Sequence, residues 1–237
     1  RPTRAGINGT PSYNSRKPIV PRGVAYTWSA PIEPIINPKK PAINPLIMSF
    51  AATDAISEMP NSITTFSQAV NAVRQKDYST AYQLFLHLAE EGDYDAQYNL
   101  AVLFKKGLGH PTHYQNALKW AFLAELGGIG KATDMREELV GIMPEDTLEL
   151  VRAEVKQVLT QRFEASDRSV ILQLAQYNLT IVKEPDLKTV YALRALAAAI
   201  GIRSAMELRD EVEAELEPKE LINAQQMAAK LYEETRW

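Results

Sequence analysis

Residues 127–131, with the sequence Gly-Gly-Ile-Gly-Lys, carry the glycines and the lysine that a phosphate-binding loop uses to hold a nucleotide. Such a loop also needs a glycine five residues before the Gly-Lys pair, where Glu125 stands. It needs a serine or threonine directly after the lysine, where Ala132 stands, and it must follow a strand. The stretch therefore predicts no nucleotide site.

A pair of histidines, His110 and His113, has the residue type of a zinc site. Both lie in one short stretch and no third ligand is evident nearby, and the chain has no cysteine to supply a thiolate. The sequence also has no G-x-S-x-G nucleophile elbow and no H-E-x-x-H motif. We therefore predict no catalytic residues, no metal and no cofactor, and hence no enzyme activity.

The elements that would have to position any site are helices. From about Ser62 onward, apolar residues recur at helical spacing in segments of roughly 11 to 20 residues. Glycines follow many of these segments, as they do where a helix ends in a left-handed residue. Those glycines are Gly92, Gly107, Gly109, Gly127 and Gly201. The pattern predicts an all-α chain of antiparallel helix pairs over residues 62–237.

The sequence also repeats itself. Residues 78–92 match residues 114–128 at a shift of 35 to 36, and residues from 117 match residues from 191 at a shift of 73 to 74. The second copy of the longer match reads as one residue shorter just after its glycine, and 143–183 reads as a helical spacer of uncertain register. Repeated helix pairs stack on one another because each pair has an apolar face that it cannot bury alone.

Small residues, an aromatic and a G-x-G turn recur at fixed places in the best repeat, which spans 96–128. The positions are Gly107, Gly109, Ala117, Trp120, Ala124 and Gly127. With these residues the chain resembles the Sel-one-like repeat (SLR) family, which is related to the tetratricopeptide repeat. The resemblance implies an α-helical solenoid and a protein–protein interaction scaffold, with other protein subunits as partners.

Within that repeat, one stripe of the first helix is a candidate partner-binding surface. Asp95, Asn99, Val102 and Lys106 stand at spacings of 0, 4, 7 and 11, which places them on one side of a helix. Inner-face residues of solenoids are the usual contact set. We therefore predict that some of these four contact a bound segment.

Residues 1–61 are predicted to form an extended, proline-rich arm and linker. Nine of the fourteen prolines lie in the first 47 positions, with seven basic residues against one acid, whereas the rest of the chain is acidic. Tyr13, Tyr26 and Trp28 are the large aromatics of the arm and are predicted to contact a partner. The alternative is that the arm packs on the acidic helices of its own chain.

Composition also bears on the cellular setting and on the kinds of partner. No run approaches 18 uninterrupted apolar residues, so no membrane-spanning segment is predicted, and the acidic helical part disfavours nucleic acid. The start at Arg1, the lack of cysteine and the proline-rich leader favour a periplasmic setting. SLR proteins in bacteria often serve envelope assemblies, so the resemblance implies a structural component of a flagellar motor-type, pilus or secretion machine. The alternative is a soluble adaptor that binds a single client in the solenoid groove.

Overall fold

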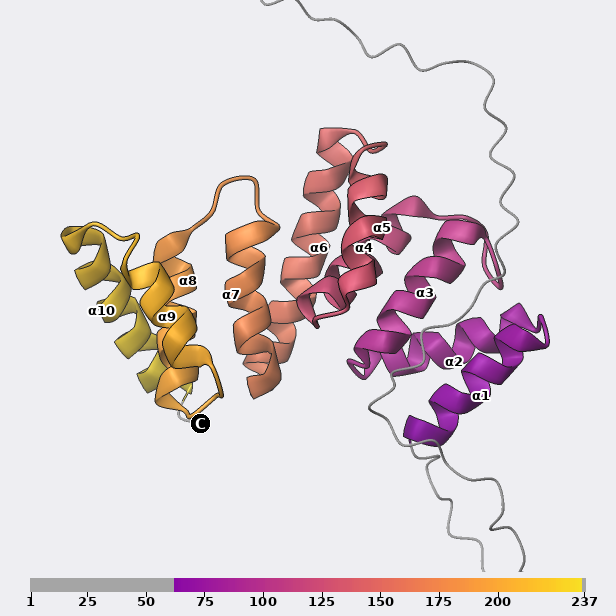
Figure 1. The fold of residues 1–237 in the computed structure, drawn as a ribbon, viewed down its shortest axis with the longest axis horizontal. Helices are drawn as coiled ribbons and strands as arrows, with labels where there is room; N and C mark the ends of the chain where they lie inside the picture. Colours follow the sequence, from indigo (N-terminus) through magenta and orange to yellow (C-terminus); the bar gives the residue numbers. More distant parts are fainter. Residues whose placement is uncertain (1–61, 236–237) are drawn as a thin grey trace, which may run out of the picture. The chain divides into compact units, whose positions relative to one another are not determined.

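A computed structural model describes residues 62–235, and within this range every regular element is a helix (Figure 1). The predicted all-α, helix-pair repeat architecture is therefore confirmed for the described part, while the arm lies outside it. The helices are α1 (Ser62–Arg74), α2 (Tyr78–Glu90), α3 (Tyr94–Lys106), α4 (Tyr114–Leu126), α5 (Gly130–Val140), α6 (Glu145–Glu164), the 3-10 turn η1 (Arg168–Val170), α7 (Ile171–Thr180), α8 (Leu187–Ala199), α9 (Ala205–Glu213) and α10 (Pro218–Thr235).

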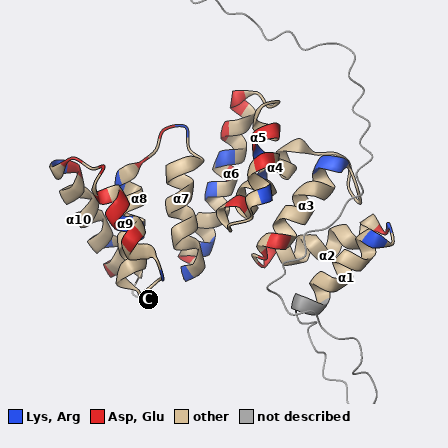
Figure 2. Cartoon of the chain, in the orientation of Figure 1, with Lys and Arg blue, Asp and Glu red and all other residues tan. Residues whose placement is uncertain are grey.

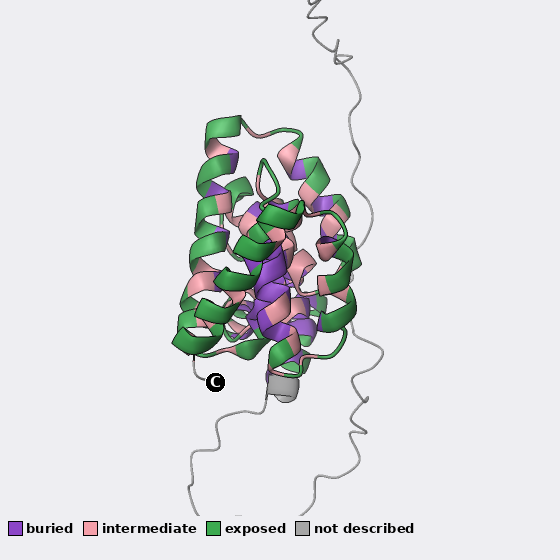
Figure 3. Ribbon diagram, turned by 90° about the vertical axis from the view of Figure 1, so that its left-hand side faces the viewer, coloured by how far each residue is buried: buried purple, intermediate pink, exposed green. Residues whose placement is uncertain are grey.

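Neighbouring helices pack in pairs. Pairs of successive helices are α1 with α2, α3 with α4, and α7 with α8, and further contacts such as α2 with α3 join one pair to another. The long helix α6 packs on both α4 and α7, and α10 packs on α8. Buried residues gather on the sides of the helices that face one another, while exposed residues cover the outer sides (Figure 3). Trp120 of the best repeat is buried, as its role in that repeat requires.

Tight turns, or joints, connect several of the helices. In the joint before α2, the amide of Asp77 donates to the carbonyl of Ala72 at 2.9 Å. In the joint before α3, the amide of Asp93 donates to the carbonyl of Leu88 at the same distance. This six-to-one hydrogen bond requires a left-handed residue just before the donor. The glycine pattern predicted only part of these joints, because Lys76 and Ser166 take the left-handed conformation without being glycine.

Two glycines of the best repeat are required by close packing. A side chain on Gly109 would place its Cβ 2.1 Å from the carbonyl oxygen of Tyr78, so the loop after α3 can lie on the start of α2 only without one. A Cβ on Gly127 would stand 2.2 Å from the ring of Tyr94. The helix break expected at Gly127 is confirmed, since α4 ends at Leu126 and Gly127 is its C-cap, but the left-handed residue is the next one, Gly128, with φ of 91°.

The longer repeat is one block of four helices that occurs twice, as α3–α6 and as α7–α10. The segment α4–α5–α6 is matched by α8–α9–α10 at a single shift of 73 residues, with the left-handed Gly128 and Gly201 at equivalent positions. The apparent one-residue deletion after the glycine is therefore wrong. Further equivalent buried pairs are Ala132 and Ala205, Leu139 and Val212, and Val151 and Ala224.

The one-residue difference lies earlier, in the loop between the first two helices of each copy. That loop covers 107–113 in the first copy and 181–186 in the second, and the N-cap residues before the first helix, Asp93 and Asp167, are 74 positions apart. The stretch 143–183, predicted to be a spacer, is thus α6, η1 and α7. It ends one copy and begins the next.

Candidate protein-binding groove

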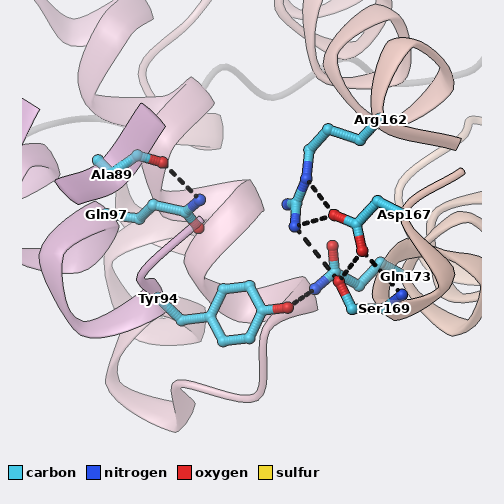
Figure 4. A network of polar contacts seen from close by, with 7 residues as sticks. All are labelled: Ala89, Tyr94, Gln97, Arg162, Asp167, Ser169 and Gln173. Carbon is cyan, nitrogen blue, oxygen red and sulfur yellow. Dashed lines mark hydrogen bonds and ion pairs between the residues drawn. The ribbon is translucent and has the colours of Figure 1, made fainter. Parts of the chain in front are cut away.

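One hydrogen bond connects helices that are far apart in the sequence. Gln173 Nε2, on α7, donates to the hydroxyl of Tyr94, the first residue of α3, at 2.5 Å (Figure 4). The ring of Tyr94 lies on Gly127 at the end of α4, so the aromatic is supported from behind. These contacts hold the start of α3, the end of α4 and the middle of α7 together.

A hollow of about 460 Å³ lies beside this bridge. Gln176, Ser169 and Thr180 contribute amide and hydroxyl groups to its wall, and such groups both donate and accept hydrogen bonds. That capacity matches the N–H and C=O groups of a peptide backbone. The two hydroxyls donate within the chain, to Asp167 Oδ1 at 2.6 Å and to the Gln176 carbonyl at 3.0 Å, so toward a ligand they act as acceptors. The described lining residues are Tyr94, Glu125, Leu126, Gly127, Gly128, Ser169, Leu172, Gln173, Gln176, Thr180 and Leu208, and we call this hollow the α3–α7 groove.

An ion pair stands next to the groove and orders its α7 side. Both Nε and Nη2 of Arg162 donate to Asp167 Oδ2, at 3.0 and 2.7 Å, and the backbone amide of Ser169 donates to Oδ1 at 2.9 Å (Figure 4). Burial raises the pKa of the Asp167 carboxyl, but the hydrogen bonds from Ser169 and Arg162 outweigh it and lower the pKa below its ordinary value. Arg162 also covers Gly92, where a Cβ would stand 2.9 Å from Nη2.

The carboxylate in the groove wall, Glu125, is already engaged. Arg136 Nε donates to Glu125 Oε2 at 2.8 Å, and the Thr133 hydroxyl donates to Oε1 at 3.3 Å. A carboxylate held in this way is suited to fixing the joint between α4 and α5. A ligand in the groove would therefore be bound through the amide and hydroxyl groups of the wall rather than through the Glu125 carboxylate.

The predicted stripe on α3 is brought to one side of the helix but is unevenly exposed. Asp95 and Asn99 are buried, with 6% and 5% of their surface exposed, and Asn99 Nδ2 donates to the Asp95 carbonyl at 2.8 Å. Val102 is half-buried and Lys106 is exposed. Their role in partner binding stays a prediction. The arm residues Tyr13, Tyr26 and Trp28 lie outside the described residues.

The two histidines considered as metal ligands, His110 and His113, make packing and capping contacts. The ring of His110 stacks on Tyr82 at a centroid distance of 5.3 Å and meets Phe104 edge-on at 4.9 Å. His113 caps α4, since its Nδ1 accepts from the backbone amide of Asn116 at 3.1 Å. Across residues 62–235, no three His, Cys, Asp or Glu side chains come together in a way that would hold a metal ion.

Sequence reasoning missed the residues that build the groove. Tyr94 and Gln173 are 79 positions apart, and no local spacing connects them. One signal was available in the sequence. Gly127 stands where the repeat requires two helices to approach closely, and Tyr94 directly follows Asp93, the N-cap of the helix that packs there.

None of the helices in residues 62–235 combines the length and the apolar character needed to cross a membrane.

Comparison with known proteins adds neither a family nor a function. No family model matches the sequence, and no curated protein matches it. A crystal structure of c5321, described as a protective antigen present in uropathogenic Escherichia coli strains and displaying an SLR fold, matches with a TM-score of 0.30 and 17% sequence identity. The match covers 75% of this chain and 31% of that chain. The helix pairs described above, rather than this match, carry the fold assignment.

Proposed function

We propose that the chain is a non-enzymatic scaffold that binds other proteins through the α3–α7 groove. The observation that carries this proposal is the groove wall, where the half-buried Gln176 and the exposed Thr180 lie beside the Tyr94 ring. Gln173, only 6% exposed, supports this wall through its hydrogen bond to the Tyr94 hydroxyl. Amides and hydroxyls on rigid helices suit the backbone of an extended peptide, and the ring supplies apolar contact area. The volume of about 460 Å³ corresponds to a few peptide residues.

The assembly that we propose is a multi-subunit machine of the bacterial cell envelope, of the flagellar motor, pilus or secretion type. In it the chain is a periplasmic structural or stabilising component, and the basic arm with Tyr13, Tyr26 and Trp28 anchors it to partner subunits. The support is the SLR resemblance together with the charge division between the basic arm and the acidic helices. The alternative is a soluble regulatory adaptor that binds one client in the groove, which the groove's small size favours.

The arm is tested by comparing the full chain with a chain that begins at residue 62. The shortened chain should keep its helicity and melting temperature yet fail to co-purify with the envelope assembly, and Tyr26→Ala with Trp28→Ala should reproduce most of that failure. If the shortened chain melts many degrees lower and still joins the assembly, the arm is a brace on its own helices.

The groove is tested separately with Gln173→Ala and Gln176→Ala in the full chain. These changes should weaken partner binding by about tenfold or more while leaving the circular dichroism spectrum unchanged. Lys156→Ala with Gln157→Ala, on the exposed side of α6, is the matched control. Equal binding by both double variants would contradict the groove proposal. A one-to-one complex of the chain with a single client would favour the adaptor alternative.

A further inference from the structure

The last described helix, α10, is the counterpart of α6 in the second copy of the repeated block. Helix α6 packs on α4 with one side and on α7 with another, whereas α10 packs on α8 and has no comparable second contact among the described helices. The first copy therefore shows what covers this position. It is an α-helix.

The side of α6 that meets α7 is marked by two contacts. The hydroxyl of Tyr177, on α7, donates to the carbonyl of Arg152 at 2.9 Å, and Arg162 binds Asp167 just before η1. Between these two positions, Val155 and Leu159 are fully buried. The four α6 residues stand at spacings of 0, 3, 7 and 10, so they share one side of the helix.

The corresponding side of α10 is more exposed, with three exposed residues and the half-buried Ala228 and Thr235. Leu159 is 0% exposed, but its counterpart Tyr232 is 53% exposed. One turn before the matched stretch, Ile222 is 56% exposed, at a position where α6 carries the charged Glu149. We call this side the α10 outer face; it consists of Ile222, Gln225, Ala228, Tyr232 and Thr235. Within the described residues, the apolar side chains of Ile222 and Tyr232 are thus left more than half exposed on this face.

We propose that the α10 outer face binds one amphipathic α-helix of a partner protein, seated as α7 is seated on α6. The net charge of the segment that ends in α10, rather than of the face alone, indicates the chemistry of that helix. Residues 205–235 hold nine acidic side chains and three basic ones, and acidic positions dominate α9 (Figure 2). The partner helix therefore carries lysine or arginine beside its apolar stripe.

A second copy of the chain is a poorer occupant. A two-fold contact through α10 brings together two segments that each hold nine acidic and three basic side chains over residues 205–235. Like charges at such an interface oppose association. The proposal goes beyond the α3–α7 groove, because it concerns a different surface and a helical rather than an extended ligand.

The test uses the full chain and a synthetic peptide with the sequence of residues 167–181, which covers the equivalent side of α6, with lysines added at both ends. We expect saturable binding by fluorescence anisotropy, weakened about tenfold or more by Tyr232→Glu. Met206→Glu is the control, since Met206 is 58% exposed on α9 outside the face. A peptide with added glutamates in place of the lysines should bind more weakly.

Four outcomes overturn the proposal. They are no saturable binding, equal loss of binding in the two variants, equal binding of the lysine and glutamate peptides, and a dimer of the chain in analytical ultracentrifugation that Tyr232→Glu dissolves. The last outcome assigns the face to a second copy. None of the four bears on the groove, whose variants are Gln173→Ala and Gln176→Ala, so failure here leaves the proposed function standing.

Discussion

The ring of Tyr94 lies directly on Gly127, so close that a Cβ at Gly127 would stand 2.2 Å from the Cγ atom of the ring. The first residue of α3 is thereby pressed against the end of α4, and its hydroxyl is turned to Gln173 on α7. Tyr94 and Gly127 both line the α3–α7 groove.

Replacement of Gly127 by alanine should therefore be costly. We expect Gly127→Ala to lower the free energy of unfolding by about 1–3 kcal/mol, because the ring must move to admit the methyl group. The measurement is urea unfolding followed by circular dichroism. Gly130→Ala is the control: a Cβ there meets nothing within 4 Å, and stability should stay equal or rise by up to about 1 kcal/mol. Equal effects at both positions would contradict the close contact.

The Tyr94–Gln173 hydrogen bond should appear as a coupling energy. Tyr94→Phe removes the hydroxyl and keeps the ring, and Gln173→Ala removes the donor. In a double-mutant cycle we expect the two changes to be coupled by about 0.5–1.5 kcal/mol in the free energy of unfolding. Strictly additive effects would show that the two side chains do not interact in solution.

The lowered pKa of Asp167 predicts a pH dependence of stability. Its folded-state pKa lies below the unfolded value, so the carboxylate contributes stability that is present above about pH 4 and is lost as the pH falls through the folded-state pKa. Asp167→Asn removes the charge and keeps an oxygen that can cap η1. We expect a loss of about 1 kcal/mol at pH 7 that narrows below about pH 4. A difference that stays constant from pH 7 to pH 3 would argue against the Arg162 pair.

The N-caps of α4 and α8 are equivalent positions with different residues. His113 caps α4 and Asp186 caps α8, each by accepting from the amide three residues later. Aspartate is the better cap and its charge suits a helix N-terminus, so His113→Asp should raise the free energy of unfolding by about 0.5–1 kcal/mol. Asp186→His should lower it by a similar amount. Chemical unfolding at pH 7 measures both, and shifts in the same direction would disprove the equivalence.

Local patterns in the sequence were sufficient to predict the helices and to show that the chain contains a repeat. Apolar residues at helical spacing predicted helices from Ser62 onward because this periodicity describes one face of a helix, whatever covers it. Glycines predicted the turns at Gly92 and Gly201, where the backbone is left-handed. Lys76 and Ser166 escaped this signal, since their left-handed conformation is imposed by the helices that they join.

The pentapeptide Ala-Gln-Tyr-Asn-Leu shows where local information ends. It occurs at 96–100 in α3 and at 175–179 in α7, yet the two copies occupy different registers of the repeat. Gln97 is buried and donates to the Ala89 carbonyl at 3.1 Å, whereas Gln176 is half-buried in the wall of the groove. A sequence alone determines which residues share a face of a helix. Which neighbour covers that face depends on packing between distant segments, and here the tertiary structure alone decided that Tyr94 meets Gln173 and that Tyr232 stays exposed where Leu159 is buried.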